Sequence, residues 1–132
     1  MVKTKPAKKR AAKGRSSPAT EEMKRHAALI AAELEQWPGV SVRPFFGMWG
    51  AWRGKRIFAA LPRTRNLGAE NTMLFKLARL TPELAKRLQA DERIADFSFS
   101  GKAQWHQFAF ESERDLPGLL AWLAEAAGPG GR

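Results

Sequence analysis

The first regular pattern of apolar residues begins about twenty positions into the chain. Apolar side chains recur there at intervals of four, three, four and three residues, at Met23, Ala27, Ile30, Leu34 and Trp37. This spacing places them on one face of an α-helix. It predicts a helix from about Thr20 to Gln36, with Thr20 as the N-cap and Pro38 ending it, because the residue before a proline disfavours the helical conformation.

Short runs of apolar and aromatic residues replace the helical period after Gly39 and indicate β-strands, and apolar residues clearly alternate in the later runs. Six are expected, over residues 40–46, 48–52, 56–61, 72–77, 96–100 and 104–111. Pro44 cannot donate a ladder hydrogen bond, which favours either an edge position for the first strand or a bulge in it. Gly54 suits the positive φ of a hairpin turn, and Gly101-Lys102 separates the last two strands. Residues 62–71 read as a polar loop.

Two further helices complete the predicted order. Thr81 is a suitable N-cap and Pro82 suits the first helical position, so one helix runs from there to near Asp91. The last helix starts near Asp115, and its apolar stripe comprises Leu116, Leu119, Leu120, Leu123 and Ala126. The order α-β-β-β-β-α-β-β-α has too few helices for a wound parallel sheet. It predicts an α+β fold, an antiparallel sheet of five or six strands packed against two or three helices.

The positive charge of the chain is concentrated at its start. The net charge is +10, and the first twenty residues contain no acid but seven bases: Lys3, Lys5, Lys8, Lys9, Arg10, Lys13 and Arg15. Residues 1–17 have too few apolar side chains to form a core, so they are expected to be a disordered tail. A single domain at 18–128 and a flexible C-terminus at 129–132 follow. Lys and Arg clusters bind phosphate backbones. We expect these seven residues to contact nucleic acid, and a solubilising tail is the alternative.

A second basic stretch is interleaved with aromatic residues. Residues 43–76 contain one acid, Glu70, and seven bases: Arg43, Arg53, Lys55, Arg56, Arg63, Arg65 and Lys76. We expect Arg53, Lys55 and Arg56, around the hairpin turn, to contact nucleic acid as well.

Four aromatic residues lie among these bases: Phe45, Phe46, Trp49 and Trp52. Trp49 and Trp52 would point to opposite faces of a regular strand, so at most one belongs to the core. Trp49 and Trp52 are the predicted interaction surface, which would stack on nucleobases or dock a protein partner. The alternative is that the aromatic side chains fill the core and the bases are solvated.

Catalytic and metal-binding chemistry is sparse. The chain has no Cys and no Tyr, which excludes disulfides and thiolate or phenolate chemistry. The histidines, His26 and His106, lie on apolar faces, where packing is their ordinary role. Asp91 and Glu92 with Asp96 form a thin carboxylate cluster for a cation. We expect no catalytic residues, no metal and no cofactor.

One segment resembles a known family. It comprises Arg43-Pro44-Phe45-Phe46-Gly47, then Gly50, then residues 53–61, and it resembles the N-terminal domain of TfoX-like competence regulators. Leu74-Phe75-Lys76 and residues 119–122 are similar to a later strand and the closing helix of that family. Phe45 stands where the family prefers Met, and Phe75 and Lys76 also depart from its pattern.

Two other bacterial groups are similar in outline. The MmcQ/YjbR proteins have a late strand with a Trp, here Trp105, before the final helix. A group that carries a luciferase-family label shares the segment Trp37-Pro38-Gly39-Val40. The resemblance spans roughly residues 22–127. It implies an α+β domain that acts in regulation or binds nucleic acid or proteins, and it implies no catalytic residues.

Together these features predict a non-enzymatic binding or regulatory domain of a bacterial cytoplasm, associated with the nucleoid if it binds DNA. Its association with nucleic acid would be weak, salt-sensitive and mainly through the tail. No apolar run is long enough to span a membrane, so no membrane partner is expected. The alternative is a protein-interaction adaptor or a self-associating domain. A small-molecule site or an enzyme would need a pocket lined by Phe97, Phe99, His106 and Phe108.

Overall fold

The computed structural model describes residues 17–97 and 105–128. The helices are α2 (Glu21–Leu34), α3 (Pro82–Ala90), α4 (Leu116–Ala127) and the short 3-10 turn η1 (Glu113–Asp115). The main strands are β2 (Val40–Phe45), β3 (Met48–Arg53), β4 (Arg56–Pro62), β6 (Thr72–Lys76), β7 (Ile94–Phe97) and β8 (Trp105–Ala109). Two two-residue strands, β1 (Ser17–Pro18) and β5 (Arg65–Asn66), pair separately. The predicted α+β class is confirmed.

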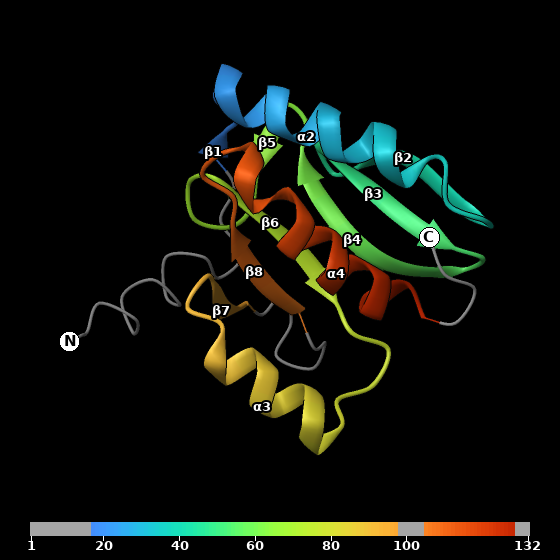
Figure 1. The fold of residues 1–132 in the computed structure, drawn as a ribbon. Helices are drawn as coiled ribbons and strands as arrows, with labels where there is room; N and C mark the ends of the chain where they lie inside the picture. Colours follow the sequence, from blue (N-terminus) through green and yellow to red (C-terminus); the bar gives the residue numbers. More distant parts are fainter. Residues whose placement is uncertain (1–16, 98–104, 129–132) are drawn as a thin grey trace.

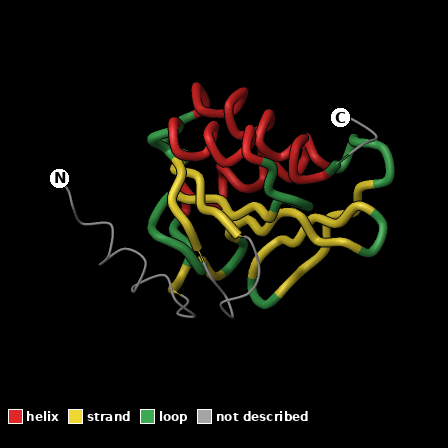
Figure 2. The backbone as a smooth tube through the Cα atoms, turned by 90° about the horizontal axis from the view of Figure 1, so that it is seen from below, coloured by secondary structure: helices red, strands yellow, loops and turns green. Residues whose placement is uncertain are grey.

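The six main strands form one antiparallel sheet in the order β2-β3-β4-β6-β8-β7. Pro44 lies in the edge strand β2, where its missing N–H leaves no ladder bond unmade. Helices α2 and α4 cross one face of the sheet (Figure 1), and a view along the sheet shows the helices to one side of the strands (Figure 2). We call the helix-covered side the inner face and the opposite side the outer face.

The main core lies between the inner face and the two crossing helices. Its largest fully buried side chains include Ile30 and Leu34 of α2, Phe58, Phe75 and Phe108 of the strands, and Leu119 and Leu123 of α4. Thr20 caps α2 as predicted, because its Oγ1 accepts a hydrogen bond from the Met23 N–H at 3.1 Å. Within the described residues, none of the helices has the length and apolar composition of a bilayer-crossing segment.

The loop between β4 and β6 is more structured than its polar composition predicts. Asn66 is 2 % exposed, and its Nδ2 donates to the carbonyls of Gly68 and Ala69 at 2.8 and 3.0 Å. The Ala69 N–H in turn donates to Gln107 Oε1 on β8 at 3.0 Å. The loop therefore lies against the outer face over β6 and β8, where Leu67 packs on a small second core that includes Leu74.

The strand after α3 starts earlier than predicted. The apolar alternation suggested residues 96–100, whereas β7 begins at Ile94, which pairs with Phe108. The side chain of Asp91 fixes this start, since it accepts the backbone N–H of Arg93 just before the strand. Phe99, the Gly101-Lys102 turn, the expected C-terminal segment 129–132 and residues 1–16 of the expected tail lie outside the described residues.

Candidate nucleic-acid interface

The outer face at the β2 edge is built from a segment without acidic residues. Residues 36–69 contain no Asp or Glu and six bases, and they form β2, β3, β4 and the start of the following loop. The local sequence therefore contributes only positive charge to this end of the sheet. Such a surface favours a polyanion.

Two of the three bases predicted at the hairpin turn hold the C-terminus of α4. Arg56 Nη2 donates to the carbonyls of Ala126 and Ala127 at 2.7 and 3.0 Å. Arg53 Nη1 donates to the Gly128 carbonyl at 2.9 Å, and its Nε donates to the Pro38 carbonyl at 3.2 Å. These guanidinium groups satisfy carbonyls at the negative end of the helix. Lys55 is exposed at the turn between them.

Trp49 and Trp52 lie on opposite faces of β3, as expected for a regular strand. Trp49 is half-buried against the main core, with the Arg63 guanidinium 5.4 Å from its ring. Trp52 is half-buried on the outer face, over Gly50. The candidate surface therefore continues from Trp52 and not from Trp49.

Four residues on the outer face and its hairpin turn form a continuous group that we call the aromatic platform: Arg43, Phe45, Phe46 and Trp52. The Arg43 guanidinium lies 4.2 Å from the centre of the Trp52 ring. Phe45 contacts Trp52 edge-to-face at 5.7 Å and Phe46 edge-to-face at 4.9 Å. A cation and three rings are thus linked by favourable geometries.

The tip of the platform is strained. Phe46 and Gly47 are the two residues of the β2–β3 turn, with φ of 51° and 78°. Positive φ at both positions defines a type I′ turn, which favours Asn-Gly because a bulky residue is strained there by about 1 kcal/mol. Phe46 is nevertheless 83 % exposed. Core packing therefore does not explain an aromatic residue at this position.

Gly50 makes room for the platform, and replacing it with alanine is expected to displace the Trp52 ring. A Cβ at this position would lie 2.5 Å from Trp52 Cη2 and 3.0 Å from Phe45 Cβ. Because Trp52 lies on the outer face, its ring can turn away into solvent without opening the main core. We expect Gly50→Ala to shift the Trp52 indole resonance strongly in a two-dimensional NMR spectrum. A spectrum that superimposes on that of the wild type would contradict this arrangement.

The expected basic tail joins the domain beside this turn. Ser17 and Pro18 pair with Asn66 and Arg65, and the Ala19 N–H donates to the Thr64 carbonyl at 3.0 Å. The N–H groups of Thr64 and Arg65 both donate to the Gly47 carbonyl at 2.9 Å. The first described residues are therefore tied to the Phe46–Gly47 turn. The seven bases predicted to bind nucleic acid, Lys3 to Arg15, lie outside the described residues.

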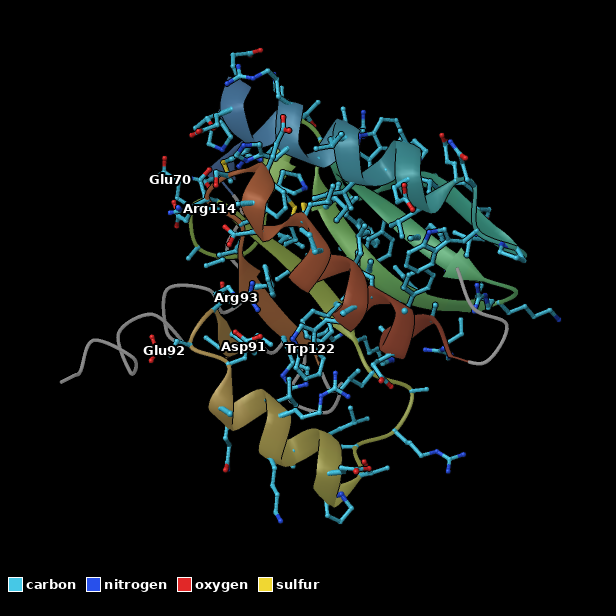
Figure 3. The ribbon with its side chains drawn as sticks, viewed as in Figure 1. Glu70, Asp91, Glu92, Arg93, Arg114 and Trp122 are labelled. Atoms are coloured by element: carbon cyan, nitrogen blue, oxygen red, sulfur yellow. The ribbon has the colours of Figure 1, made fainter. Side chains whose placement is uncertain are left out.

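A second polar site joins α3 to α4. An open groove of about 660 Å³ runs there, lined by Arg87, Asp91, Arg93, Gly118 and Trp122 among others. Figure 3 shows Asp91 and Arg93 pointing toward one another beside Trp122.

The Asp91 carboxylate at this junction is saturated with hydrogen bonds. It accepts from Arg93 Nε and Nη2 at 2.9 and 3.0 Å and from Trp122 Nε1 at 3.0 Å. The hydrogen bonds from Arg93 lower the pKa of Asp91 to about 2. The arrangement fastens two elements together and leaves this carboxylate no free hydrogen-bonding capacity for a ligand.

The other titratable candidates are packed. His106 is buried next to Phe75, and His26 contacts Phe110 edge-to-face at 4.9 Å. Phe108, expected to line a pocket if the protein bound a small molecule, is fully buried in the main core. Among the described residues, no group of three or more His, Asp or Glu side chains could hold a metal ion.

The comparisons with known proteins add no relative. No protein-family model, no curated protein and no solved structure matches the chain. The resemblance to TfoX-like and MmcQ/YjbR domains therefore stays a prediction.

Proposed function

We propose that this protein is a non-enzymatic nucleic-acid-binding domain whose basic tail and outer sheet face act together. The proposal rests on the connection between two positive segments, the basic tail and the acid-free segment 36–69. The tail, with seven bases, enters the domain through β1, which is tied to the turn of the acid-free segment 36–69. Phosphate contacts from Lys and Arg give sequence-independent affinity that falls with salt.

The bases of the sheet surface differ in their availability. In the described part of the chain, Arg43 stacks on Trp52 and has no carboxylate partner, and Lys55 is exposed without one. Arg53 and Arg56 donate to the end of α4. The proposal therefore rests on the tail, Arg43 and Lys55, and the predicted contacts of Arg53 and Arg56 carry less of it.

Neutralising the tail should remove most of the affinity. We expect the full-length variant with glutamine at positions 3, 5, 8, 9, 10, 13 and 15 to bind oligonucleotides more weakly and with a shallower salt dependence. Seven phosphate contacts on a single strand would contribute about 5 to the slope of log K against log salt. Fluorescence anisotropy with a labelled 20-mer between 50 and 200 mM salt measures this slope.

A variant with the same substitution at exposed bases elsewhere controls for net charge. Three other bases are exposed on or next to α2 and α3, away from the Phe46–Gly47 turn: Arg25, Arg79 and Lys86. Changing these three to glutamine should alter the slope by much less per charge removed. Equal effects per charge, or no binding by wild-type protein at 50 mM salt, would refute the proposal.

The alternative function, a protein-interaction or self-associating domain, is favoured by one observation. The exposed Phe46 is the kind of aromatic anchor that protein interfaces use. Light scattering across a concentration series separates the two proposals, because self-association would raise the apparent mass while nucleic-acid binding alone leaves the free protein monomeric.

A further inference from the structure

Neither core packing nor turn propensity explains the residue at position 46, which is an exposed Phe with a positive φ. A type I′ turn before Gly47 would be most stable with Asn or Gly at this position. The chain instead carries a large apolar ring that is 83 % exposed, and the ring contacts Phe45 without entering the core. A large apolar residue in a strained conformation at the surface is an outlier that leads to a hypothesis of function.

The rest of the platform shows what such a ring would bind. Trp52 lies across Gly50, with Arg43 stacked on it and Phe45 linking it to Phe46. The planar guanidinium of Arg43 and the exposed ring of Phe46 present π surfaces beside a positive charge. Unpaired nucleobases stack on surfaces of this kind while the backbone phosphates contact the cation.

We propose that the aromatic platform binds single-stranded nucleic acid by base stacking, with Phe46 as the principal stacking residue. This inference rests on the proposed function, because the tail would supply the phosphate contacts that bring the strand to the domain. The preferred ligand of the domain is then an unpaired strand.

A single strand fits the surface better than a duplex or a protein partner does. In a duplex the base faces are occupied by their neighbours, so an exposed ring has nothing to stack on unless the duplex opens. A protein partner would have to neutralise the Arg43 guanidinium, which has no carboxylate partner among the described residues. The 34 residues of segment 36–69 contain no acid that could pair with the basic residues of such a partner. The loop before β6 covers the outer face over β6 and β8, and the platform at β2 and β3 lies beyond that cover.

The test uses full-length protein and two replacements of Phe46 that separate stacking from turn stability. Phe46→Asn provides the preferred turn residue and removes the ring, so we expect a higher Tm together with roughly 5- to 100-fold weaker binding to a 15-nucleotide thymidine strand. Phe46→Trp keeps a ring, so the affinity should stay within about threefold of wild type. Leu80→Asn is the matched control, since Leu80 is an exposed apolar residue, 43 % exposed, ahead of α3.

The outcomes separate this inference from the proposed function. Weaker single-strand binding by Phe46→Asn, with an unchanged salt slope and unchanged duplex affinity, would support the platform, since Phe46 carries no charge. If wild-type protein and Phe46→Asn bind the strand equally well while the tail variant does not, the platform inference is wrong and the proposed function stands. If wild-type protein binds neither ligand, both fall. A concentration-dependent mass that Phe46→Asn abolishes would assign the platform to self-association instead.

Discussion

Replacing Asp91 with alanine is expected to lower the free energy of unfolding by about 3 kcal/mol, because it breaks the link between α3 and α4. The Asp91 side chain is 14 % exposed and accepts hydrogen bonds from Arg93 and from Trp122 Nε1. Its removal leaves a guanidinium and an indole N–H without their acceptor, and such losses at largely buried charged pairs cost about 3 kcal/mol or more. Trp122 also stacks on Phe75 at 5.7 Å, so its displacement reaches the main core.

The same carboxylate makes the fold sensitive to acid. The pKa of Asp91 is lowered from 3.8 to about 2 by the hydrogen bonds from Arg93, a difference worth about 2 kcal/mol. Because the folded pKa is the lower one, this stabilisation is present above about pH 4 and is lost as the pH falls toward 2.

Urea unfolding of the wild type, Asp91→Ala and Asp91→Asn measures both effects. The difference in unfolding free energy between wild type and Asp91→Asn should be constant from pH 7 to 5 and should shrink toward pH 2. Glu92→Gln is the matched control, since Glu92 is the exposed neighbouring acid. A difference that does not depend on pH, or an equal loss in Glu92→Gln, would show that Asp91 does not hold the two helices.

Replacing Arg56 with glutamine is expected to destabilise the fold by about 2 kcal/mol, because α4 loses its C-terminal cap. The last turn of α4 contains no basic residue, and the carbonyls of Ala126 and Ala127 accept from Arg56 Nη2 at 2.7 and 3.0 Å. Hydrogen bonds from charged donors contribute about 1.5–3 kcal/mol, and the shorter glutamine cannot reach both carbonyls.

Lys55→Gln separates this structural role from a role in binding. Lys55 is exposed at the same turn, so its replacement should leave the urea midpoint unchanged and reduce the salt slope of binding by somewhat less than one. Arg56→Gln should lower the urea midpoint and leave the salt slope unchanged at temperatures where it is folded. The reverse pattern would mean that Arg56 faces the ligand and that α4 ends without it.

The parts of the fold that follow from local patterns were predictable. Three signals depend on residues close in the sequence: the 3.6-residue period of α2, the N-caps Thr20 and Thr81, and the alternation in β6 and β8. The missing N–H of Pro44 also acts locally and indicated an edge strand or a bulge, and β2 is the edge strand. These signals predicted the class and the order of elements.

The parts that depend on distant partners were not predictable in the same way. From the sequence alone, Arg56 is interpreted as a free base of a hairpin turn. Its hydrogen-bond partners, the carbonyls of Ala126 and Ala127, lie 70 and 71 residues away. Asp91 reads as part of an acidic cluster, although it faces Trp122 from another helix. Nothing local to either residue identifies its partner.

The platform was partly visible in the sequence. The sequence predicts Trp49 and Trp52 together as the interaction surface, from their place in a basic stretch. The structure places only Trp52 on the outer face, because Trp49 packs against the main core. A Phe before Gly47 at a two-residue connection is the signal that would have singled out Phe46, since such a turn prefers Asn. The stacking of Arg43 on Trp52 depends on the β2–β3 register and on the space above Gly50, which only the structure shows.

The most direct test of the nucleic-acid surface is an NMR titration of uniformly ¹⁵N-labelled full-length protein with a 15-nucleotide thymidine strand. We expect shifts on the amides of the basic tail, residues 3–15, and of Lys55. We also expect a cluster of shifts on the amides of residues 43–52 and a shift of the Trp52 indole. The indole N–H groups of Trp37 and Trp122 donate to Glu33 and Asp91, and their resonances should not shift. Shifts centred on the α3–α4 groove, or no shifts at saturating oligonucleotide and low salt, would contradict binding at the tail and the aromatic platform.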